Sequence, residues 1–198
     1  MTTAILARMG NSFVVKEHVG LFKAASNYDI YDPATGKLLL TCREPKLGLL
    51  TKILRFTDYK RMTPFALEVR TETSELLLEV KRGVALFRSR VTVTDNQGRT
   101  LGVFQQKLLS IGGKFDVLDA NGQVACTLKG KWTGWDFSFA QGEMELARVT
   151  KKWSGIGKEL LTSADNYVLH ISPSVPTDHS VRALIMAAVL CIDKVLKE

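Results

Sequence analysis

The stretch ALIMAAVLCI, residues 183–192, is an uninterrupted apolar run that lies between Arg182 and Asp193. A helix that crosses the hydrocarbon core of a bilayer needs about 20 mostly apolar residues, and this run has about half that length. A helix that is apolar on every side must be surrounded either by protein or by lipid. We therefore expect this segment to form a helix that is buried in the centre of the fold.

The expected helix covers about residues 177–196. Pro176, Thr177 and Asp178 form a helix-start signal in which Thr177 or Asp178 is the cap. A helix at the membrane interface, or inserted in the membrane, is the alternative, because Lys194 and Lys197 are suited to contact lipid head groups.

Most of the remaining chain has the pattern of short strands that are joined by turns. In each of four places a glycine follows polar residues between two runs of Val, Ile, Leu, Thr and Phe, which is typical of a β-hairpin. The predicted turns are Asp32–Gly36, Asp95–Gly98, Asp119–Gly122 and Gln141–Gly142. Their succession indicates one meandering antiparallel sheet.

A sheet of about a dozen short strands has edges, and closure into a barrel removes them. The side chains of the strands alone do not fill so wide a barrel, so the apolar helix supplies the missing core. The predicted fold class is therefore mainly β: a closed antiparallel barrel of about 12 strands around a buried C-terminal helix. A β-sandwich with a helix across one face is the alternative.

Length and composition are those of a globular protein. The 198 residues fit a single domain, 1–198, with 45% hydrophobic and 24% charged residues. The 27 lysines and arginines exceed the 20 acidic residues by seven, which favours anionic partners such as phospholipid head groups.

The cysteines and the N-terminus indicate a reducing compartment. Cys42, Cys126 and Cys191 are odd in number and have no C-x-x-C spacing, which argues against a disulfide framework and against a zinc site. The first residues also lack the pattern of a secretory signal. We expect a cytoplasmic protein, peripheral to a membrane if it is associated with one.

Two C-terminal segments, KKWSGIGKELLTSADNYVLHI (151–171) and ALIMAAVLCID (183–193), resemble the end of the phospholipid scramblase family. That family has a basic pair, Trp, a small residue and Gly, then Thr-x-Ala-Asp-Asn-aromatic, then an apolar helix that ends near Ile-Asp. The matching positions are Lys151, Lys152, Trp153, Gly155, Glu159, Thr162, Ala164, Asp165, Asn166, Tyr167, Ile192 and Asp193.

The resemblance extends from roughly Phe13 to the C-terminus, because the order of hairpins is similar to that of the same superfamily. This superfamily includes the LURP-one-related and Tubby-like domains. It implies a twelve-stranded barrel around a C-terminal helix, and it makes lipid scrambling a candidate function. Unlike animal scramblases, the chain has no proline-rich N-terminal region, and only Cys42 lies where those proteins have a lipidated cysteine-rich segment.

The resemblance also implies a calcium site around Asp165 and Asn166. A calcium loop needs about six or more oxygen ligands, usually several of them carboxylates, whereas the only carboxylates between Ser163 and Asp178 are Asp165 and Asp178. Any calcium site here should be no tighter than the millimolar range. The other interpretation is that Asp165 and Asn166 cap a turn that leads into the last strand.

One segment, Glu44 to Pro64, departs from the strand pattern. Its leucines and isoleucines have helical spacing, and it carries the densest basic cluster of the chain, which is the composition of a peripheral lipid-binding surface. The alternative is a solvated helix packed against the barrel wall. The candidate lipid-binding residues are Lys46, Lys52, Arg55, Lys60 and Arg61.

The sequence motifs argue against catalysis. SGIGKE lacks the glycine and the Ser or Thr that a phosphate-binding loop requires, and there is neither H-E-x-x-H nor G-x-S-x-G. No enzyme activity, no cofactor and no nucleic-acid partner is expected. The sequence predicts a non-enzymatic binding or scaffold module with anionic lipid or protein partners, and the alternative is a phospholipid scramblase.

Overall fold

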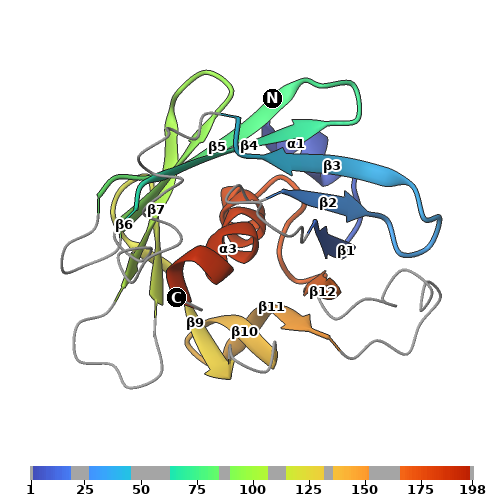
Figure 1. The fold of residues 1–198 in the computed structure, drawn as a ribbon. Coiled ribbons are helices and arrows are strands. Elements are labelled where there is room, and N and C mark those ends of the chain that lie inside the picture. The colour runs from blue at the N-terminus through green and yellow to red at the C-terminus, as the bar shows by residue number, and fades with distance from the viewer. Residues whose placement is uncertain are drawn as a thin grey trace.

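The computed structural model describes residues 2–18, 27–45, 63–84, 90–106, 115–131, 136–151 and 166–196. Two helices, α1 (Thr2–Ala7) and α3 (Ser180–Leu196), accompany strands β1 to β12 (Figure 1). The strands are Ser12–Glu17, Tyr28–Tyr31, Leu38–Arg43, Phe65–Thr71, Leu76–Arg82, Arg90–Asp95, Thr100–Gln106, Phe115–Asp119, Val124–Lys131, Asp136–Gln141, Met144–Thr150 and Asn166–Ile171.

The strands form one closed barrel. Each strand pairs antiparallel with its neighbours in the chain, and β1 closes the circle against β12 through pairs such as Phe13 with Leu169. The barrel surrounds α3, which lies at its centre in Figure 1. The predicted barrel and its central helix are confirmed, and the sandwich alternative is wrong.

The four predicted hairpin turns are all present, and aspartate side chains hold three of them. Oδ1 of Asp95 accepts the N–H groups of Gln97 and Arg99, each at 2.9 Å, and Asp32 and Asp119 accept turn N–H groups in the same way. Gly98 has a φ of 77°, which is a left-handed conformation that favours glycine. A fifth hairpin, β4–β5, turns at Ser74 instead of a glycine and was not predicted; there φ is 67°.

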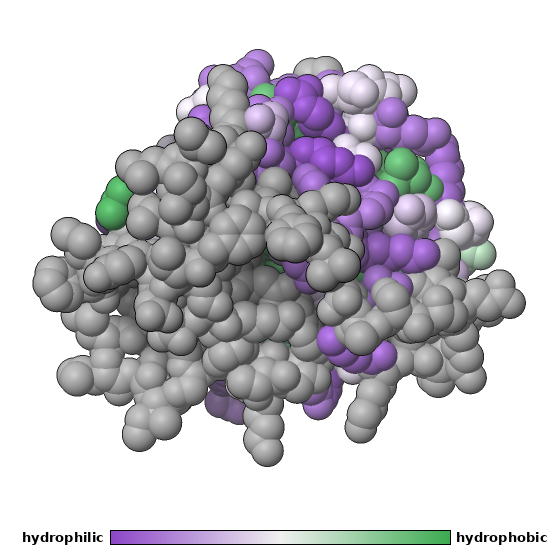
Figure 2. All heavy atoms as spheres, viewed as in Figure 1, coloured by the Kyte–Doolittle hydropathy of each residue, from purple (hydrophilic) through white to green (hydrophobic). Residues whose placement is uncertain are grey.

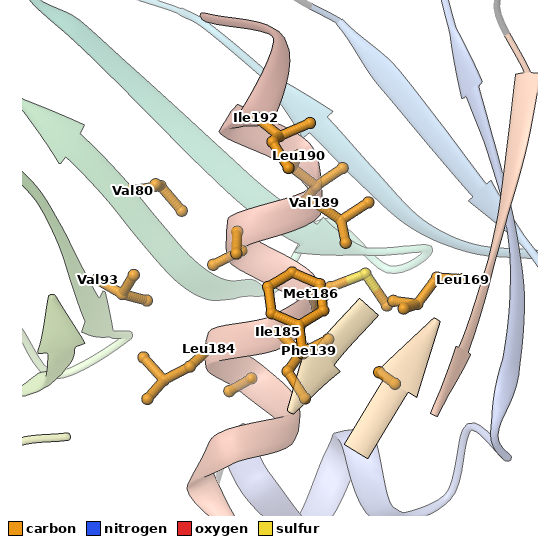
Figure 3. Packing of buried hydrophobic residues seen from close by; sticks show 14 of the residues in the cluster. Val80, Val93, Phe139, Leu169, Leu184, Ile185, Met186, Val189, Leu190 and Ile192 are labelled. Atoms are coloured by element: carbon orange, nitrogen blue, oxygen red, sulfur yellow. The ribbon is translucent and has the colours of Figure 1, made fainter. Parts of the chain in front are cut away.

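Residues 181–190 of α3 are all buried, because side chains from every part of the barrel wall pack around the helix (Figure 3). Leu184 is 0% exposed, and Ala188 and Ile192 are each 7% exposed. Val80, Phe139 and Leu169 belong to the same hydrophobic cluster (Figure 3). The helix thus supplies the core of the barrel, as predicted, and the alternative of an interfacial or membrane-inserted helix is wrong.

The start of the helix differs from the prediction, because α3 begins at Ser180 and not near residue 177. Thr177 and Asp178 lie in a turn that is closed by a hydrogen bond of 3.1 Å from the N–H of His179 to the carbonyl of Pro176. His179 is the cap, since its Nδ1 accepts the N–H of Val181 at 3.1 Å.

The helix approaches the wall closely at Gly102 of β7. A Cβ at this position would lie 2.2 Å from the carbonyl oxygen of Leu118 and 2.8 Å from Cδ2 of Leu184. Glycine is needed here because any side chain would displace the neighbouring strand or the helix.

The short helix α1 was not predicted from the sequence. Its Leu6 is 3% exposed and joins the hydrophobic cluster to which α3 belongs. This helix therefore covers the end of the barrel at which α3 begins.

Candidate functional site

The topology places the segments between strands at two distinct ends of the barrel. Because neighbouring strands alternate in direction, the strand ends that are joined by the connections from an odd strand to the next even strand all lie at one end of the barrel, which we call the connector end. The return connections from β2 to β3, β4 to β5, β6 to β7, β8 to β9 and β10 to β11 lie at the other end, which we call the turn end. Helix α3 begins at the turn end, because β12 ends there.

A buried arginine holds the start of α3 at the turn end. Arg182 is 2% exposed, and its guanidinium donates hydrogen bonds to Asn11 Oδ1 at 2.9 Å, to the carbonyl of Val175 at 3.4 Å and to the carbonyl of Gly10. Burial lowers the pKa of Arg182 from its usual value. All three acceptors are neutral oxygens from the segments before β1 and after β12, so Arg182 ties both segments to the helix.

Three side chains at the connector end form a charged cluster on the outer face of the barrel. His18 follows β1, Asp29 is in β2 and Arg43 is the last residue of β3. Arg43 Nη2 donates to Asp29 Oδ1 at 2.5 Å, and His18 Nε2 lies 2.7 Å from Asp29 Oδ2. Tyr31 also donates to Asp29 Oδ2, at 3.4 Å.

The hydrogen bonds of this cluster hold the ends of three strands together. Arg43 Nη1 donates to the carbonyls of Tyr28, at 2.6 Å, and of Cys42, at 2.9 Å, so its guanidinium is used within the fold. The side chain of Asp29 is only 13% exposed, whereas those of His18 and Arg43 are 45% and 41% exposed. Sequence reasoning did not identify this cluster, because only the pairing of β1, β2 and β3 brings the three residues together.

The carboxyl group of Asp29 should make the stability of the barrel sensitive to acid. Burial raises the pKa of Asp29, but hydrogen bonds and charge from Arg43 and His18 outweigh burial and bring the pKa below its ordinary value of 3.8. The ionised form therefore stabilises the fold above pH 3.8, and this contribution is lost as the pH falls through the lower pKa of the folded state.

We expect Asp29→Asn to be less stable than the wild type near neutral pH, with a difference that narrows as the pH falls below 3.8. Urea unfolding at a series of pH values measures the loss of stability near neutral pH and its change with pH. Arg43→Gln is the companion variant: it keeps the carboxyl group but removes its main partner, so the pKa of Asp29 in the folded state should be less depressed and the acid-dependent loss of stability should be smaller than in the wild type. A difference in the free energy of unfolding between Asp29→Asn and the wild type that stays constant with pH would contradict this account.

The five candidate lipid-binding residues lie outside the described residues. Lys46, Lys52, Arg55, Lys60 and Arg61 belong to residues 46–62, which join β3 to β4 and therefore attach at the connector end. The structure neither tests their predicted role nor brings them together.

Of the two residues of the candidate calcium site, Asp165 lies outside the described residues. Asn166 is the first residue of β12, is 5% exposed and pairs with Lys16 of β1. Within the described ranges no group of three or more His, Cys, Asp or Glu side chains is placed to hold a metal ion. The calcium site stays a prediction.

Two of the three cysteines are buried in the barrel. Cys42 is 0% exposed and Cys126 is 1% exposed. Burial, together with the charge of Asp116, raises the pKa of Cys126 to about 12. Because the thiolate is the reactive form of cysteine, neither side chain is suited to nucleophilic chemistry or to lipid attachment in the folded state.

The outer wall of the barrel carries ion pairs along its strands. Figure 2 shows a mostly hydrophilic described surface with isolated apolar residues. Exposed pairs of this kind add little to stability, but they balance the charge of the wall. The pairs include Lys37 with Glu72 at 3.0 Å, Arg70 with Glu68 at 2.7 Å, Lys81 with Glu79 at 2.7 Å and Arg148 with Asp136 at 2.8 Å.

Among the described residues, neither helix combines the length and the apolar character that a transmembrane span requires. Residues 14–197 match the model of the family described as Scramblase. The barrel is also similar to the X-ray structure of a protein from Arabidopsis thaliana, with a TM-score of 0.58 and 16% sequence identity over 98% of each chain. At this identity the likeness concerns the fold alone, and it confirms the Tubby-like architecture.

Proposed function

Because this chain belongs to the Scramblase family, we propose that it is a non-enzymatic binding module that attaches reversibly to anionic phospholipid surfaces. The observation that carries the proposal is the uneven distribution of charge along the chain. The segments of the connector end are residues 18–27, 44–64, 83–89, 107–114, 132–135 and 151–165. Together they contain 12 lysines and arginines but only four acidic residues.

This composition supports binding to anionic head groups. Lysine and arginine near an anionic bilayer contribute about 1 kcal/mol each at modest ionic strength. The same segments also contain all three tryptophans, Trp132, Trp135 and Trp153, and several leucines and phenylalanines. Aromatic and apolar side chains next to basic ones are the composition of peripheral membrane-binding surfaces.

A second candidate function is the scrambling of phospholipids between leaflets, which the family membership favours. Scrambling requires a path along which a polar head group crosses the bilayer. In this barrel the interior is filled by α3 and by the apolar side chains around it, such as Leu184, Ile185 and Met186 (Figure 3). This packing favours a binding module over a scramblase whose lipid path runs through the barrel.

Co-sedimentation with vesicles that contain phosphatidylserine tests the proposal. We expect binding to these vesicles but not to vesicles of phosphatidylcholine alone. The binding should fade as salt rises, because the screening length falls from about 10 Å at 0.1 M to about 3 Å at 1 M.

Two results would contradict the binding proposal: no sedimentation with anionic vesicles at low salt, or retention that is resistant to high salt. In the same preparations, transfer of labelled lipid between leaflets should not exceed that of protein-free vesicles. Transfer above that control would favour the scramblase.

A further inference from the structure

We infer that residues 2–10 form a latch on the turn end, which opens while the barrel stays folded, and that Arg182 holds this latch closed. The latch consists of α1 and the turn that follows it, and α1 packs against α3. Opening of the latch uncovers the start of α3. The latch is independent of the proposed lipid binding.

Few contacts attach the latch to the barrel. The N–H groups of its last turn donate to carbonyls within the latch itself. Among the hydrogen bonds of the described residues, a single one joins the latch to the rest of the chain: Arg182 Nη2 donates to the carbonyl of Gly10. Leu6 is 3% exposed, whereas Ile5 and Met9 are only partly buried against the same hydrophobic cluster. Closure of the latch thus depends on one apolar anchor and one polar one.

The latch has no stability of its own. Helix α1 has six residues, whereas isolated helices shorter than about 12–15 residues are marginal in water. Undocking therefore also unwinds α1, and the latch opens as a unit. The barrel does not depend on the latch for its hydrogen bonds, because the ladder between β1 and β12 closes the sheet.

The closed latch buries a cation without an opposite charge. Arg182 is 2% exposed, and its acceptors are three neutral oxygens, of Gly10, Asn11 and Val175. Its Nε has no hydrogen-bond acceptor among the described residues. Burial of a charged group is unfavourable unless an opposite charge compensates it. Opening moves Gly10 away and lets water reach the guanidinium, so the open state lies closer in free energy to the closed one.

Gly10 is placed to act as the hinge of the latch. The next residue, Asn11, is fixed, because its carbonyl accepts the N–H of Ile171 at 2.7 Å and its Oδ1 accepts Nη1 of Arg182 at 2.9 Å. Gly10 has a φ of 70°, a left-handed conformation that glycine adopts without strain. Its backbone can therefore change conformation while Asn11 keeps its place before β1.

Thiol labelling of the full chain measures the opening. Leu6→Cys, in a Cys191→Ala background, places a thiol on the latch, and the native Cys42 and Cys126, at 0% and 1% exposed, are the reference in the barrel wall. A reagent reaches a buried thiol when the structure around it opens, so we expect the Leu6→Cys thiol to react about a hundredfold faster than the native two. Equal rates would mean that only unfolding of the barrel exposes residue 6, which would overturn the inference.

Two further variants in this background test how the latch is held. Arg182→Lys keeps the buried charge but lacks the planar guanidinium that donates to Gly10 and Asn11 together. Gly10→Ala strains the closed conformation, because a residue with a side chain disfavours a φ of 70°. Each variant should accelerate labelling of the Leu6→Cys thiol at least about fivefold, since the left-handed conformation alone costs a residue with a side chain that much.

Gly36→Ala is the matched control. Gly36 has a φ of 68° in the turn between β2 and β3, and at either glycine a Cβ would meet nothing within 4 Å. Because this turn is the same in the open and the closed latch, labelling of the Leu6→Cys thiol should stay within about twofold of the parent. Equal acceleration by Gly36→Ala and Gly10→Ala, or none by Gly10→Ala, would overturn the hinge.

No acceleration by Arg182→Lys would overturn the role of Arg182. If this variant does not fold, all three thiols react rapidly and together, and the comparison of Gly10→Ala with Gly36→Ala then decides whether the latch exists.

Discussion

Ala187→Asp should leave no soluble, cooperatively folding protein. Ala187 is 0% exposed and lies near the middle of α3, inside the closed barrel. A carboxylate at this position enters a cluster made of aliphatic and aromatic side chains, where it must either remain charged without a partner or become protonated. We expect a loss of more than about 4 kcal/mol, which is a large part of the stability of a typical domain.

Ala120→Asp is the matched control. Ala120 lies in the exposed turn between β8 and β9, so the same chemical change occurs in water. The control should be soluble and should melt within a few degrees of the wild type. Expression, solubility and thermal melting of the two variants measure the difference. A soluble Ala187→Asp protein that melts cooperatively near the wild-type temperature would show that the helix is not enclosed by the barrel.

The barrel could be predicted because the hairpin-turn signals and the need to bury the apolar run at 183–192 indicate the same fold. The aspartates and glycines of the hairpin turns act within a few residues of the chain, as Asp95 and Gly98 do, so their effect is visible in the sequence. The apolar run at 183–192 is equally direct, because it is apolar on every side and too short to span a bilayer, which favours burial in protein. The turn signals predict a sheet with an apolar face to be buried, and the apolar run predicts a helix that must itself be buried, so the two predictions fit each other.

Other features depend on contacts that no local pattern reveals. His18, Asp29 and Arg43 meet only through the register of three strands. Gly102 is required because the carbonyl of Leu118 in the neighbouring strand and the side chain of Leu184, some eighty residues further along the chain, both lie against it. The cap of α3 was assigned to Thr177 or Asp178 because these residue types cap most helices. The turn that Pro176 and His179 close moves the start of the helix to Ser180.

The candidate lipid-binding residues were chosen by composition and by the helical spacing of the leucines and isoleucines beside them, and neither signal determines where a segment lies in the fold. What the fold adds is their place in the topology: residues 46–62 join two strands at the basic end of the barrel. From the sequence alone, the net charge of +7 could be assigned only to the chain as a whole. The strand order shows that the segments with eight more basic than acidic residues are all attached to strand ends at one end of the barrel.

Lys52→Glu combined with Arg55→Glu should release the protein from anionic vesicles. The double variant changes the local charge by four units, and each unit near the surface is worth about 1 kcal/mol at modest ionic strength. The upper limit is thus about 4 kcal/mol, or roughly a thousandfold in the dissociation constant. We expect at least a tenfold weakening, measured by co-sedimentation with phosphatidylserine vesicles at about 0.1 M salt.

The matched control is Lys37→Glu combined with Arg8→Glu. It also reverses one lysine and one arginine, and it brings the net charge of the chain to the same value, but both residues are exposed at the turn end. Its affinity should stay within about threefold of the wild type, because the turn end lies roughly 20 Å from the basic segments and charges are screened within about 8 Å. Equal weakening of both double variants would mean that net charge alone drives the binding, and would remove residues 46–62 from any specific role. Unchanged binding of the Lys52 and Arg55 variant would place the lipid-binding surface elsewhere on the molecule.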